Sequence, residues 1–483
     1  MSNFFKHIII GSGAAGSMVA TELIKKNSSV AIIEEGRSFD DNYFKAKKIA
    51  TRNKNLWRNG GLTAFFGKSI IPYAEGVAVG GTTVSNGGVI ERPSKEWIEN
   101  LKNKFEVDGF EYENLQNIFS EVEQKLNVRH HYKENENKNL DSKIWSNYLD
   151  KMKISYRKSN LAHSNCKNSN QCISGCPNNA KQTNVLLNYL PEAKKKGTKI
   201  FHKNKVTRIK KVGKNWEIQT INENKKLIFT CEFLYMAAGA IQTPTLLKKN
   251  GLSKTAGQRL SFHLNYQILV KFKDILNSKN GTIFTTDIDH YKNLGMSFNP
   301  ANFQKSYMFS KFSNLNNDQV NLIEKNISNY GMYISQLKVD GHATIKANLF
   351  GQPIITYELL NSDFERIKQS IKIISDILIG SGAEEIILPY DNFKILRSKN
   401  EINNIIDNFD LSKMNFVCAH MMSSCAMGNT GKEVVDGTGS LLGENNLTVV
   451  DASIIPECTG ESPQLTIMSI AKRIIEIKML NKI

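Results

Sequence analysis

Apolar residues at the start of the chain follow a strand–helix–strand pattern. Residues 7–11 read HIIIG, typical of a short buried strand, and residues 17–26 place apolar side chains at helical spacing. Residues 30–33 read VAII and are followed directly by Glu34. This order predicts the opening unit of an α/β domain.

The loop between this strand and helix is rich in glycine. It reads GSGAAG, and its candidate cofactor-binding residues are Gly11, Gly13, Ala14, Ala15 and Gly16. In the G-x-G-x-x-G pattern the glycines permit a tight turn, close approach of a phosphate and packing of helix on strand. Glu34 stands where a carboxylate can accept hydrogen bonds from ribose hydroxyls. The pattern predicts a dinucleotide site, with a structural turn as the alternative.

A second glycine-rich segment, residues 75–93, reads EGVAVGGTTVSNGGVIERP. Its candidate ligand contacts are Gly80, Gly81, Thr82, Thr83 and Asn86. Here the backbone could lie against a flat ligand while the polar side chains contact it. Taken alone, the segment fits a glycine-rich surface loop equally well.

The second half of the chain alternates short strand-like runs with one long helical run. The strand-like runs are residues 266–272, 332–339, 342–349 and 353–359, and the helical run is 364–382. This pattern predicts an antiparallel sheet with helices on one side. Earlier in the chain, residues 121–145 begin as a helix and turn polar, as expected for a linker or flap.

Composition narrows the class of protein. The chain has 483 residues, 40% of them hydrophobic and 23% charged, as expected for a globular enzyme of two or more lobes. The net charge is +17, but the lysines are scattered and form no Arg-rich stripe, which argues against nucleic acid. We expect no leader peptide, no transmembrane segment and a cytoplasmic location. Seven cysteines, an odd number, argue against a disulfide framework.

The segment HMMSSCAMG, residues 420–428, provides candidate chemistry. It contains His420, and the strand-like LTVVD that ends at Asp451 follows about thirty residues later. A neutral histidine can act as a general base because its ordinary pKa is about 6.5. A buried structural histidine is the alternative.

Several of these segments together resemble the glucose-methanol-choline (GMC) family of FAD-dependent oxidoreductases. The opening glycine loop resembles the FAD-binding segment, and residues 79–87 and 237–252 resemble the first and second signatures. The segment at 420–428 resembles the catalytic-histidine segment, and residues from 449 onward resemble the closing FAD segment. The resemblance implies a discontinuous Rossmann-like FAD-binding domain with an α+β substrate domain built on an antiparallel sheet.

The resemblance also implies roles for residues outside the first loop. His420 would be the catalytic base, and Ser462 stands where the family places a second histidine or an asparagine; a one-residue shift would bring Glu461 there instead. We interpret His263, which follows the second signature, as structural. The further FAD contacts that the resemblance implies are Val206, Ala238, Asp451, Ala452, Gln464 and Leu465.

Three cysteines cluster in residues 166–176. Cys166, Cys172 and Cys176 have the spacing C-x5-C-x3-C, and Pro177 follows. The spacing resembles the 3Fe–4S loop of FAD-dependent sugar dehydrogenase catalytic subunits. The alternatives are a structural loop without metal, a zinc site or a disulfide. The other cysteines, which we expect to be buried apolar residues, are Cys231, Cys418, Cys425 and Cys458.

We therefore expect a dehydrogenase that oxidises a small alcohol or sugar, with an oxidase or a redox-silent GMC-fold lyase or accessory subunit as alternatives. An electron-acceptor protein or small accessory subunit is a possible partner, and export with such a subunit stays open. The expected domain limits are 1–100, 155–262 and 413–483 for the three parts of the FAD-binding domain, 101–154 for the linker and 263–412 for the substrate domain.

Overall fold

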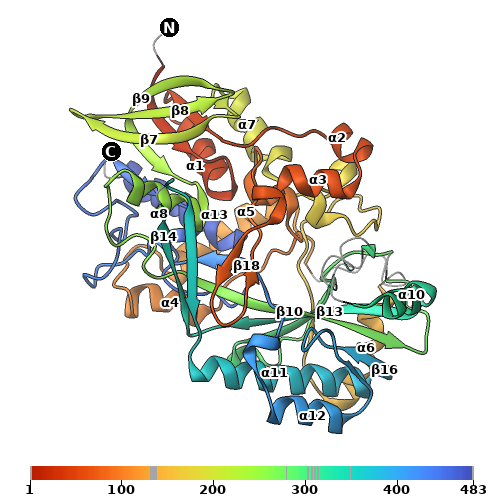
Figure 1. Ribbon diagram of the computed structural model, residues 1–483. Coiled ribbons are helices and arrows are strands. Elements are labelled where there is room, and N and C mark those ends of the chain that lie inside the picture. Colours follow the sequence, from red (N-terminus) through yellow and green to blue (C-terminus); the bar gives the residue numbers. More distant parts are fainter. Residues whose placement is uncertain are drawn as a thin grey trace.

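The computed structural model describes residues 3–480 except 131–138, 279, 302, 303, 306, 307, 309–311, 313, 314 and 349. Two large sheets dominate it, one in the upper part and one in the lower part of the view in Figure 1. The polar segment 131–138, part of the predicted flap, lies outside the described residues.

The upper sheet has seven strands in the order β6-β2-β1-β9-β8-β7, with β19 also paired to β9. Its parallel strands come from three distant parts of the chain, and β7, β8 and β9 form an antiparallel meander. The strands are β1 (Phe4–Ile10), β2 (Val30–Ile33), β6 (Lys199–Phe201), β7 (Lys205–Val212), β8 (Asn215–Asn222), β9 (Lys225–Met236) and β19 (Leu447–Val449).

Helices pack on this sheet, so its central strands are buried. All four residues of β2 are buried, and β1 is buried from Ile8 onward. Helix α1 (Ala14–Ile24) contacts β1, β2 and α13 (Gln464–Leu480). The first and last helices of the chain therefore pack together beside the glycine loop.

The lower sheet has six strands in the order β12-β13-β10-β16-β17, with β18 also paired to β10. All its pairs are antiparallel. The strands are β10 (Ser261–Phe272), β12 (Met296–Pro300), β13 (Tyr330–Lys338), β16 (Ala383–Ile387), β17 (Ile395–Leu396) and β18 (Val417–Met422).

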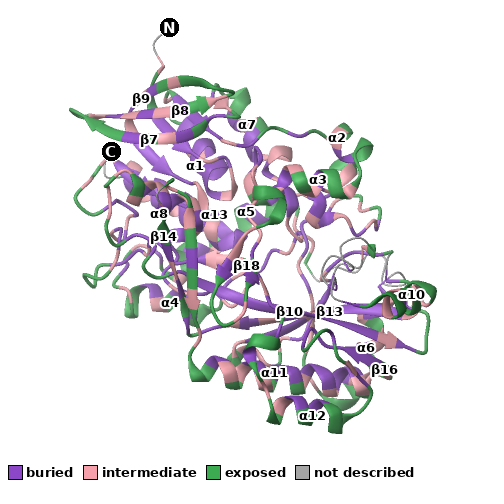
Figure 2. Cartoon of the chain, viewed as in Figure 1, coloured by how far each residue is buried: buried purple, intermediate pink, exposed green. Residues whose placement is uncertain are grey.

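The central strand β10 is buried on both faces, and Figure 2 shows it as a buried band through the lower half. Leu264, Tyr266 and Ile268 join the same apolar cluster as Ile367 and Ile371 of α11 (Asn361–Gly380). The intervening residues His263, Asn265 and Gln267 are polar and buried on the opposite face. One face of this sheet is thus apolar packing, and the other carries polar groups.

Two predicted strands leave this sheet. The runs at 342–349 and 353–359 form β14 (His342–Ala347) and β15 (Pro353–Glu358), which join a separate four-stranded sheet with β3 (Ala64–Phe66) and β4 (Ile71–Pro72). The pattern predicted strands here but not that β15 would pair in parallel with β3, about 290 positions earlier.

The predicted linker, residues 101–154, contains α5 (Tyr112–Lys125) and α6 (Leu140–Met152), and α4 (Lys95–Asn103) crosses its first boundary. Helix α5 packs on α13, and α6 packs on α11, so the linker contacts both halves of the molecule. The predicted fold class is confirmed. The domain limits stay predictions; β18, from the predicted third part of the FAD-binding domain, pairs with β10 in the lower sheet. In the described ranges no helix is both long and apolar enough to cross a membrane.

Candidate active site

The glycine loop has the backbone that a phosphate site requires. Gly11 has φ of +102°, and a Cβ there would lie 2.2 Å from the carbonyl oxygen of Ala237. A Cβ on Gly16 would lie 2.0 Å from the oxygen of Gly11, whereas Gly13 has its nearest atom 3.9 Å away. Helix α1 begins at Ala14 with no acidic residue in its first turn. The turn is therefore tight on one side and open at Gly13, where a phosphate can approach.

Glu34 holds this loop in place. Its carboxylate accepts hydrogen bonds from the N–H of Ser12 at 3.0 Å, the hydroxyl of Ser12 at 2.7 Å and the N–H of Gly36 at 2.8 Å. Burial raises the pKa of Glu34, and these donors act in the opposite direction. Ser12, which the sequence analysis did not select, thus links the acid to the loop. The ribose contact of Glu34 stays a prediction.

The second glycine-rich segment lies against the first. Gly80 and Gly81 both have positive φ, and the N–H of Gly80 donates to the hydroxyl of Ser12 at 2.9 Å. A Cβ on Gly81 would lie 3.0 Å from the Cα of Gly13. Two consecutive residues with positive φ favour glycine at both positions. Thr83 donates to the oxygen of Gly80 at 2.6 Å, and Thr82 accepts from the N–H of Gly76 at 3.0 Å.

Asn86 and Gln464 meet from opposite ends of the chain. The amide of Asn86 donates to the side-chain oxygen of Gln464 at 2.5 Å. The hydroxyl of Thr183 donates to Asn86 at 2.8 Å, and Gln464 donates back to the carbonyl of Thr183 at 3.0 Å. The neighbouring Leu465 is fully buried in the upper core. Three segments therefore close one polar triangle at the start of α13.

Asp451 joins the second signature to the closing segment. Its carboxylate accepts from the N–H of Gly239 at 2.8 Å, the hydroxyl of Thr243 at 2.5 Å and the N–H of Ser453 at 2.9 Å. Ala238 donates its N–H to Thr243, and Ala452 begins a short 3-10 helix. The sixth implied FAD contact, Val206, is buried on β7 opposite Thr220. Apart from Val206, these residues lie at or near the β9–α8 turn of the upper sheet, where α8 spans Gly239–Lys249.

His420 lies beside His263. The ladder between β10 and β18 shifts register between Phe262 and Leu264, so Ala419 and His420 stand opposite His263. The two Nδ1 atoms are 2.9 Å apart. His420 is half-buried and His263 fully buried.

Burial lowers the pKa of both histidines. The pKa of His420 falls to about 4. That of His263 is also lowered, first by burial and then by His420 and Lys338. Both rings are therefore neutral at pH 7, and His420 keeps a lone pair with which it can act as a base.

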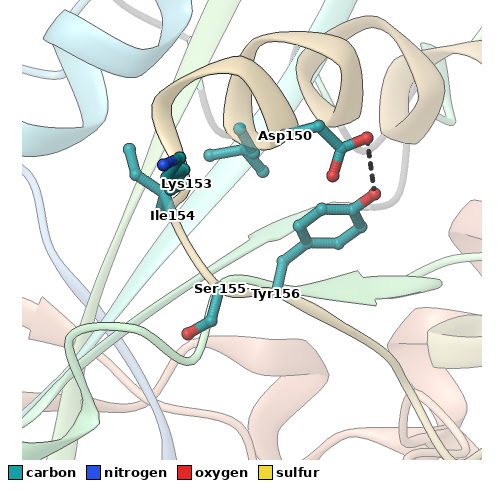
Figure 3. Close-up of a pocket in the computed structure, with 6 residues that line it drawn as sticks. Asp150, Lys153, Ile154, Ser155 and Tyr156 are labelled. Carbon is teal, nitrogen blue, oxygen red and sulfur yellow. Dashed lines mark hydrogen bonds between the residues drawn. The ribbon is translucent and has the colours of Figure 1, made fainter.

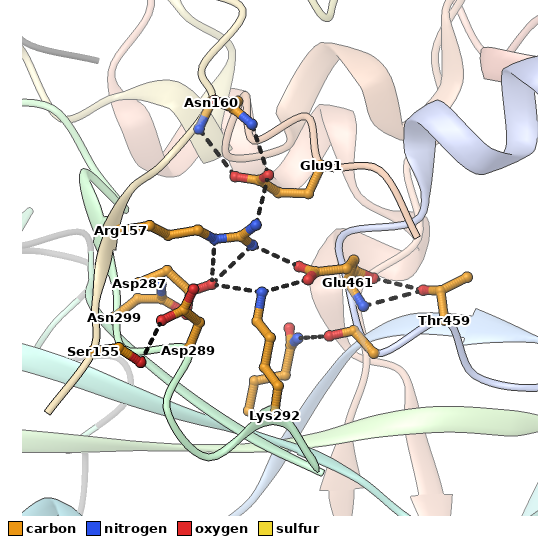
Figure 4. Close-up of polar contacts among 12 residues, drawn as sticks. Glu91, Ser155, Arg157, Asn160, Asp287, Asp289, Lys292, Asn299, Thr459 and Glu461 are labelled. Atoms are coloured by element: carbon orange, nitrogen blue, oxygen red, sulfur yellow. Dashed lines mark hydrogen bonds and ion pairs between the residues drawn. The ribbon is translucent and has the colours of Figure 1, made fainter. Parts of the chain in front are cut away.

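The loop before α13 carries both candidates for the second catalytic position. The Glu461 carboxylate forms ion pairs with Arg157 at 3.0 Å and with Lys292, in the group drawn in Figure 4. These cations also bind Asp287, and Arg157 binds Glu91. Burial raises the pKa of Glu461 and the two cations act in the opposite direction, while both ion pairs hold its carboxylate in place. The neighbouring Ser462 is half-buried and carries an uncharged hydroxyl.

Beneath this loop, Gln336 of β13 donates to the carbonyl of Gly460 at 3.4 Å. Gln336 pairs with Asn265 across β10 and β13, and Lys338 pairs with His263. Because paired residues share a face, the polar face of the lower sheet is the one turned toward the Ser462 loop. The catalytic-histidine strand and the last signature therefore meet over this face.

The cysteine loop is held by a buried lysine. Lys181 donates to the carbonyls of Val84, Asn86 and Cys172, each at 2.9 Å, and burial lowers its pKa to about 8. The loop thus packs directly against the first signature. The sequence analysis missed Lys181; a lone lysine four residues after Cys-Pro gave no signal of its burial.

The three thiols do not form one metal-binding group. Cys172 and Cys176 interact with each other, which lowers the pKa of Cys176 and raises that of Cys172, and Cys166 also raises the pKa of Cys172. Cys166 instead lies 3.4 Å from the hydroxyl of Thr282 and from the N–H of Asn168. Among the described residues, no three His, Cys, Asp or Glu side chains form a group suited to a metal ion. The other four cysteines are buried, as expected.

A small surface pocket lies at the end of α6 and is shown in Figure 3. Its lining comes from residues 149–156, with Tyr156 donating to Asp150 at 3.4 Å. None of the predicted site residues lies in this range. The pocket is separate in sequence from the glycine loops and His420.

The fold and the glycine turn indicate a dinucleotide-binding enzyme. The model of the GMC oxidoreductase family matches residues 5–265 in its N-terminal part and 338–471 in its C-terminal part. The chain belongs to the GMC oxidoreductase family and is an FAD-dependent oxidoreductase; members of the family act on alcohol-type donors. The glycine turn, open at Gly13 and closed at Gly11 and Gly16, fits this cofactor.

Similar proteins agree with this family. The chain is 26% identical to the uncharacterized GMC-type oxidoreductase y4nJ of Sinorhizobium fredii, over 97% of this chain and 93% of the relative. It is 23% identical to the long-chain-alcohol oxidase FAO4A of Arabidopsis thaliana, over 96% and 67%. The crystal structure of pyridoxine 4-oxidase from Mesorbium loti matches with a TM-score of 0.74, 14% identity and 99% coverage of both chains. A formate oxidase structure matches with a TM-score of 0.75 and 14% identity, over 100% and 99%.

Proposed function

We propose that this protein oxidises the CH–OH group of a small alcohol or sugar, with His420 as the base. FAD, when bound, accepts the hydride from the carbinol carbon. His420 takes the hydroxyl proton, so the products are a carbonyl compound and reduced flavin. The observation that carries the proposal is a neutral histidine, with its pKa lowered to about 4, on the strand that joins the lower sheet beside the closing signature.

Ser462 would steer the substrate oxygen in this proposal. A hydroxyl can donate or accept a hydrogen bond but does not act as a second base at neutral pH. Its neighbour Glu461 is fixed by Arg157 and Lys292, which holds the loop rather than the substrate. His420 therefore acts as the single base, and Ser462 orients the alcohol.

An anaerobic screen tests the proposal. Purified FAD-loaded protein is mixed without oxygen with glucose, glycerol, ethanol, 1-octanol, benzyl alcohol and choline, and flavin absorbance is followed. Bleaching by at least one alcohol, with the matching carbonyl product, is expected. If no alcohol in this panel or in a wider one bleaches the flavin, the protein is the redox-silent alternative.

The electron acceptor separates two candidate functions. A dehydrogenase would pass electrons to a carrier or accessory protein; the cysteine spacing led the sequence analysis to expect it, although the three thiols do not form one metal-binding group in the described residues. An oxidase would pass them to O2, and the names of relatives such as the long-chain-alcohol oxidase favour that. We keep the dehydrogenase as the proposal: flavin reduced by an alcohol should reoxidise faster with a dye acceptor than with air-saturated buffer. The reverse order of rates would identify the oxidase.

A further inference from the structure

The contact between His263 and His420 fixes more than the position of two rings. Two neutral imidazoles joined Nδ1 to Nδ1 at 2.9 Å cannot both carry the proton on that atom. One ring donates and holds its proton on Nδ1, and the other accepts and holds its proton on Nε2. The contact therefore couples the tautomers of the two residues.

The strand geometry makes this contact specific. The register shift between Phe262 and Leu264 places one extra residue on β18 opposite His263. Such bulges re-aim a side chain and are frequent beside active sites. The His263 side chain is fully buried, and it lies on the polar face of β10 rather than in the apolar core.

The chemistry selects one of the two tautomer pairs. If His263 donated, His420 would carry its proton on Nε2 and could not take a second proton there from an alcohol. If His420 donates, its Nε2 keeps the lone pair, and the same hydrogen bond stabilises the imidazolium formed when that atom is protonated. The Nε2 of His263 has no hydrogen-bond partner in the part of the chain that the structure describes, so no second contact decides the tautomer of His263 and the choice rests on the role of His420.

We propose that His263 is the positioning residue for His420: it accepts the Nδ1–H of His420 and so holds the Nε2 of His420 ready as the base. The inference rests on the proposed function of His420. The residue that orients His420 therefore comes from β10. The last signature carries Ser462 in place of a histidine or asparagine, and Ser462 is not given this role. His263 touches His420 and is not itself required to touch the substrate.

The groups around this pair are few. Lys338 of β13 faces His263 across the ladder and disfavours its protonation. On β18, the Cys418 thiol donates to the carbonyl of His420. Burial raises the pKa of Cys418 and of Cys458, and Cys458 further raises the pKa of Cys418. The thiols are uncharged at pH 7, so Lys338 is the charged neighbour that a pH experiment must take into account.

A tautomer measurement tests the proposal without any substrate. The FAD-loaded full chain is labelled with 15N-histidine, and long-range proton–nitrogen correlations assign His420 by its loss in His420→Gln. The expected result is a proton on Nδ1 of His420 and on Nε2 of His263. A proton on Nε2 of His420 in the wild-type protein would overturn the proposal.

Variants of His263 add a kinetic test. Asn places an amide oxygen near the position of Nδ1 and keeps an acceptor, whereas Leu of similar size has none. With the panel alcohol that reduces flavin fastest, His263→Leu should slow reduction about 10- to 100-fold at saturating alcohol, the range found for outer contacts that orient an active group. His263→Asn should restore most of that rate, and His342→Leu, at an exposed histidine, should match wild type.

Equal losses in His263→Leu and His263→Asn would show that His263 matters only for packing. If His263→Leu fails to hold FAD, the tautomer of His420 in wild type and in His263→Asn still decides. If no alcohol reduces the flavin at all, the proposed function fails, while the tautomer result stands by itself. The two failures are therefore distinguishable.

Discussion

Asn86 donates a hydrogen bond to Gln464 at 2.5 Å, although 378 positions separate the two residues. This contact joins the first signature to the start of α13, and Thr183 completes it from a third segment. Asn86 and Gln464, both predicted cofactor contacts, therefore hold each other in position through this hydrogen bond. Loss of one should weaken all three segments.

Gln464→Leu should lower FAD affinity about tenfold and reduce the melting temperature. It leaves the Asn86 amide and the Thr183 carbonyl without their partner, at a cost of about 1–3 kcal/mol. FAD retention on dialysis and thermal unfolding measure this, with Gln124→Leu on the exposed face of α5 as the control. Equal FAD retention in the two variants would show that the Asn86–Gln464 contact does not support the cofactor.

The rate of flavin reduction should be nearly independent of pH above about 6. The pKa of His420 is lowered to about 4, and the active base is the unprotonated ring, so the rate rises with pH through that value and then levels. Anaerobic stopped-flow reduction across pH 4 to 9 measures it. A rate that levels only above pH 7 would show that the working base is not a histidine with a lowered pKa.

Glu91→Gln should make thermal stability less sensitive to pH. Glu91, Asp287 and Glu461 share Arg157 and Lys292, leaving one excess negative charge, and burial raises the pKa of Glu91 to about 7. Because the pKa of Glu91 is higher in the folded protein, its contribution to the free energy of unfolding is fully present below the unfolded pKa of 4.5. That contribution is lost as the pH rises through 7.

The wild-type protein should therefore lose up to about 3 kcal/mol from this group between pH 4.5 and 8, less whatever solvent screens. Melting temperatures of wild type, Glu91→Gln and the exposed control Glu96→Gln are compared across this range. Parallel pH curves for wild type and Glu91→Gln would contradict the raised pKa.

Cys172→Ser should leave the visible spectrum and the iron content unchanged. Among the described residues, Cys166, Cys172 and Cys176 do not form a group suited to a metal ion, and the Cys166 thiol contacts Thr282. Iron analysis and absorbance of freshly prepared protein measure this. A broad brown absorbance that disappears in Cys172→Ser would restore the 3Fe–4S interpretation.

The glycine turn could be located from the sequence more readily than the neighbour of His420. Gly11, Gly13 and Gly16 follow a local pattern whose geometry is dictated by backbone sterics, so spacing alone located the turn. His263 was interpreted as structural, whereas its contact with His420, 157 positions later, depends on a β-bulge between β10 and β18. No local period encodes such a register shift.

Ion pairing likewise lay beyond the sequence. Glu461 looked like an alternative to Ser462 because a carboxylate can act as a base. Its ion pairs with Arg157 and Lys292 join segments that are far apart in the sequence and meet only in the folded chain. The partners of β15 were missed for the same reason, since alternation predicts a strand but not its neighbour.

The rate of anaerobic flavin reduction in His420→Ala tests the central claim most directly. The variant should keep its FAD, because the described cofactor loops do not use His420, and should reduce its flavin about 10²- to 10⁴-fold more slowly than wild type, the usual contribution of a general base. FAD content and rate are measured on the same sample with the fastest panel alcohol. A wild-type rate in FAD-loaded His420→Ala would contradict the account.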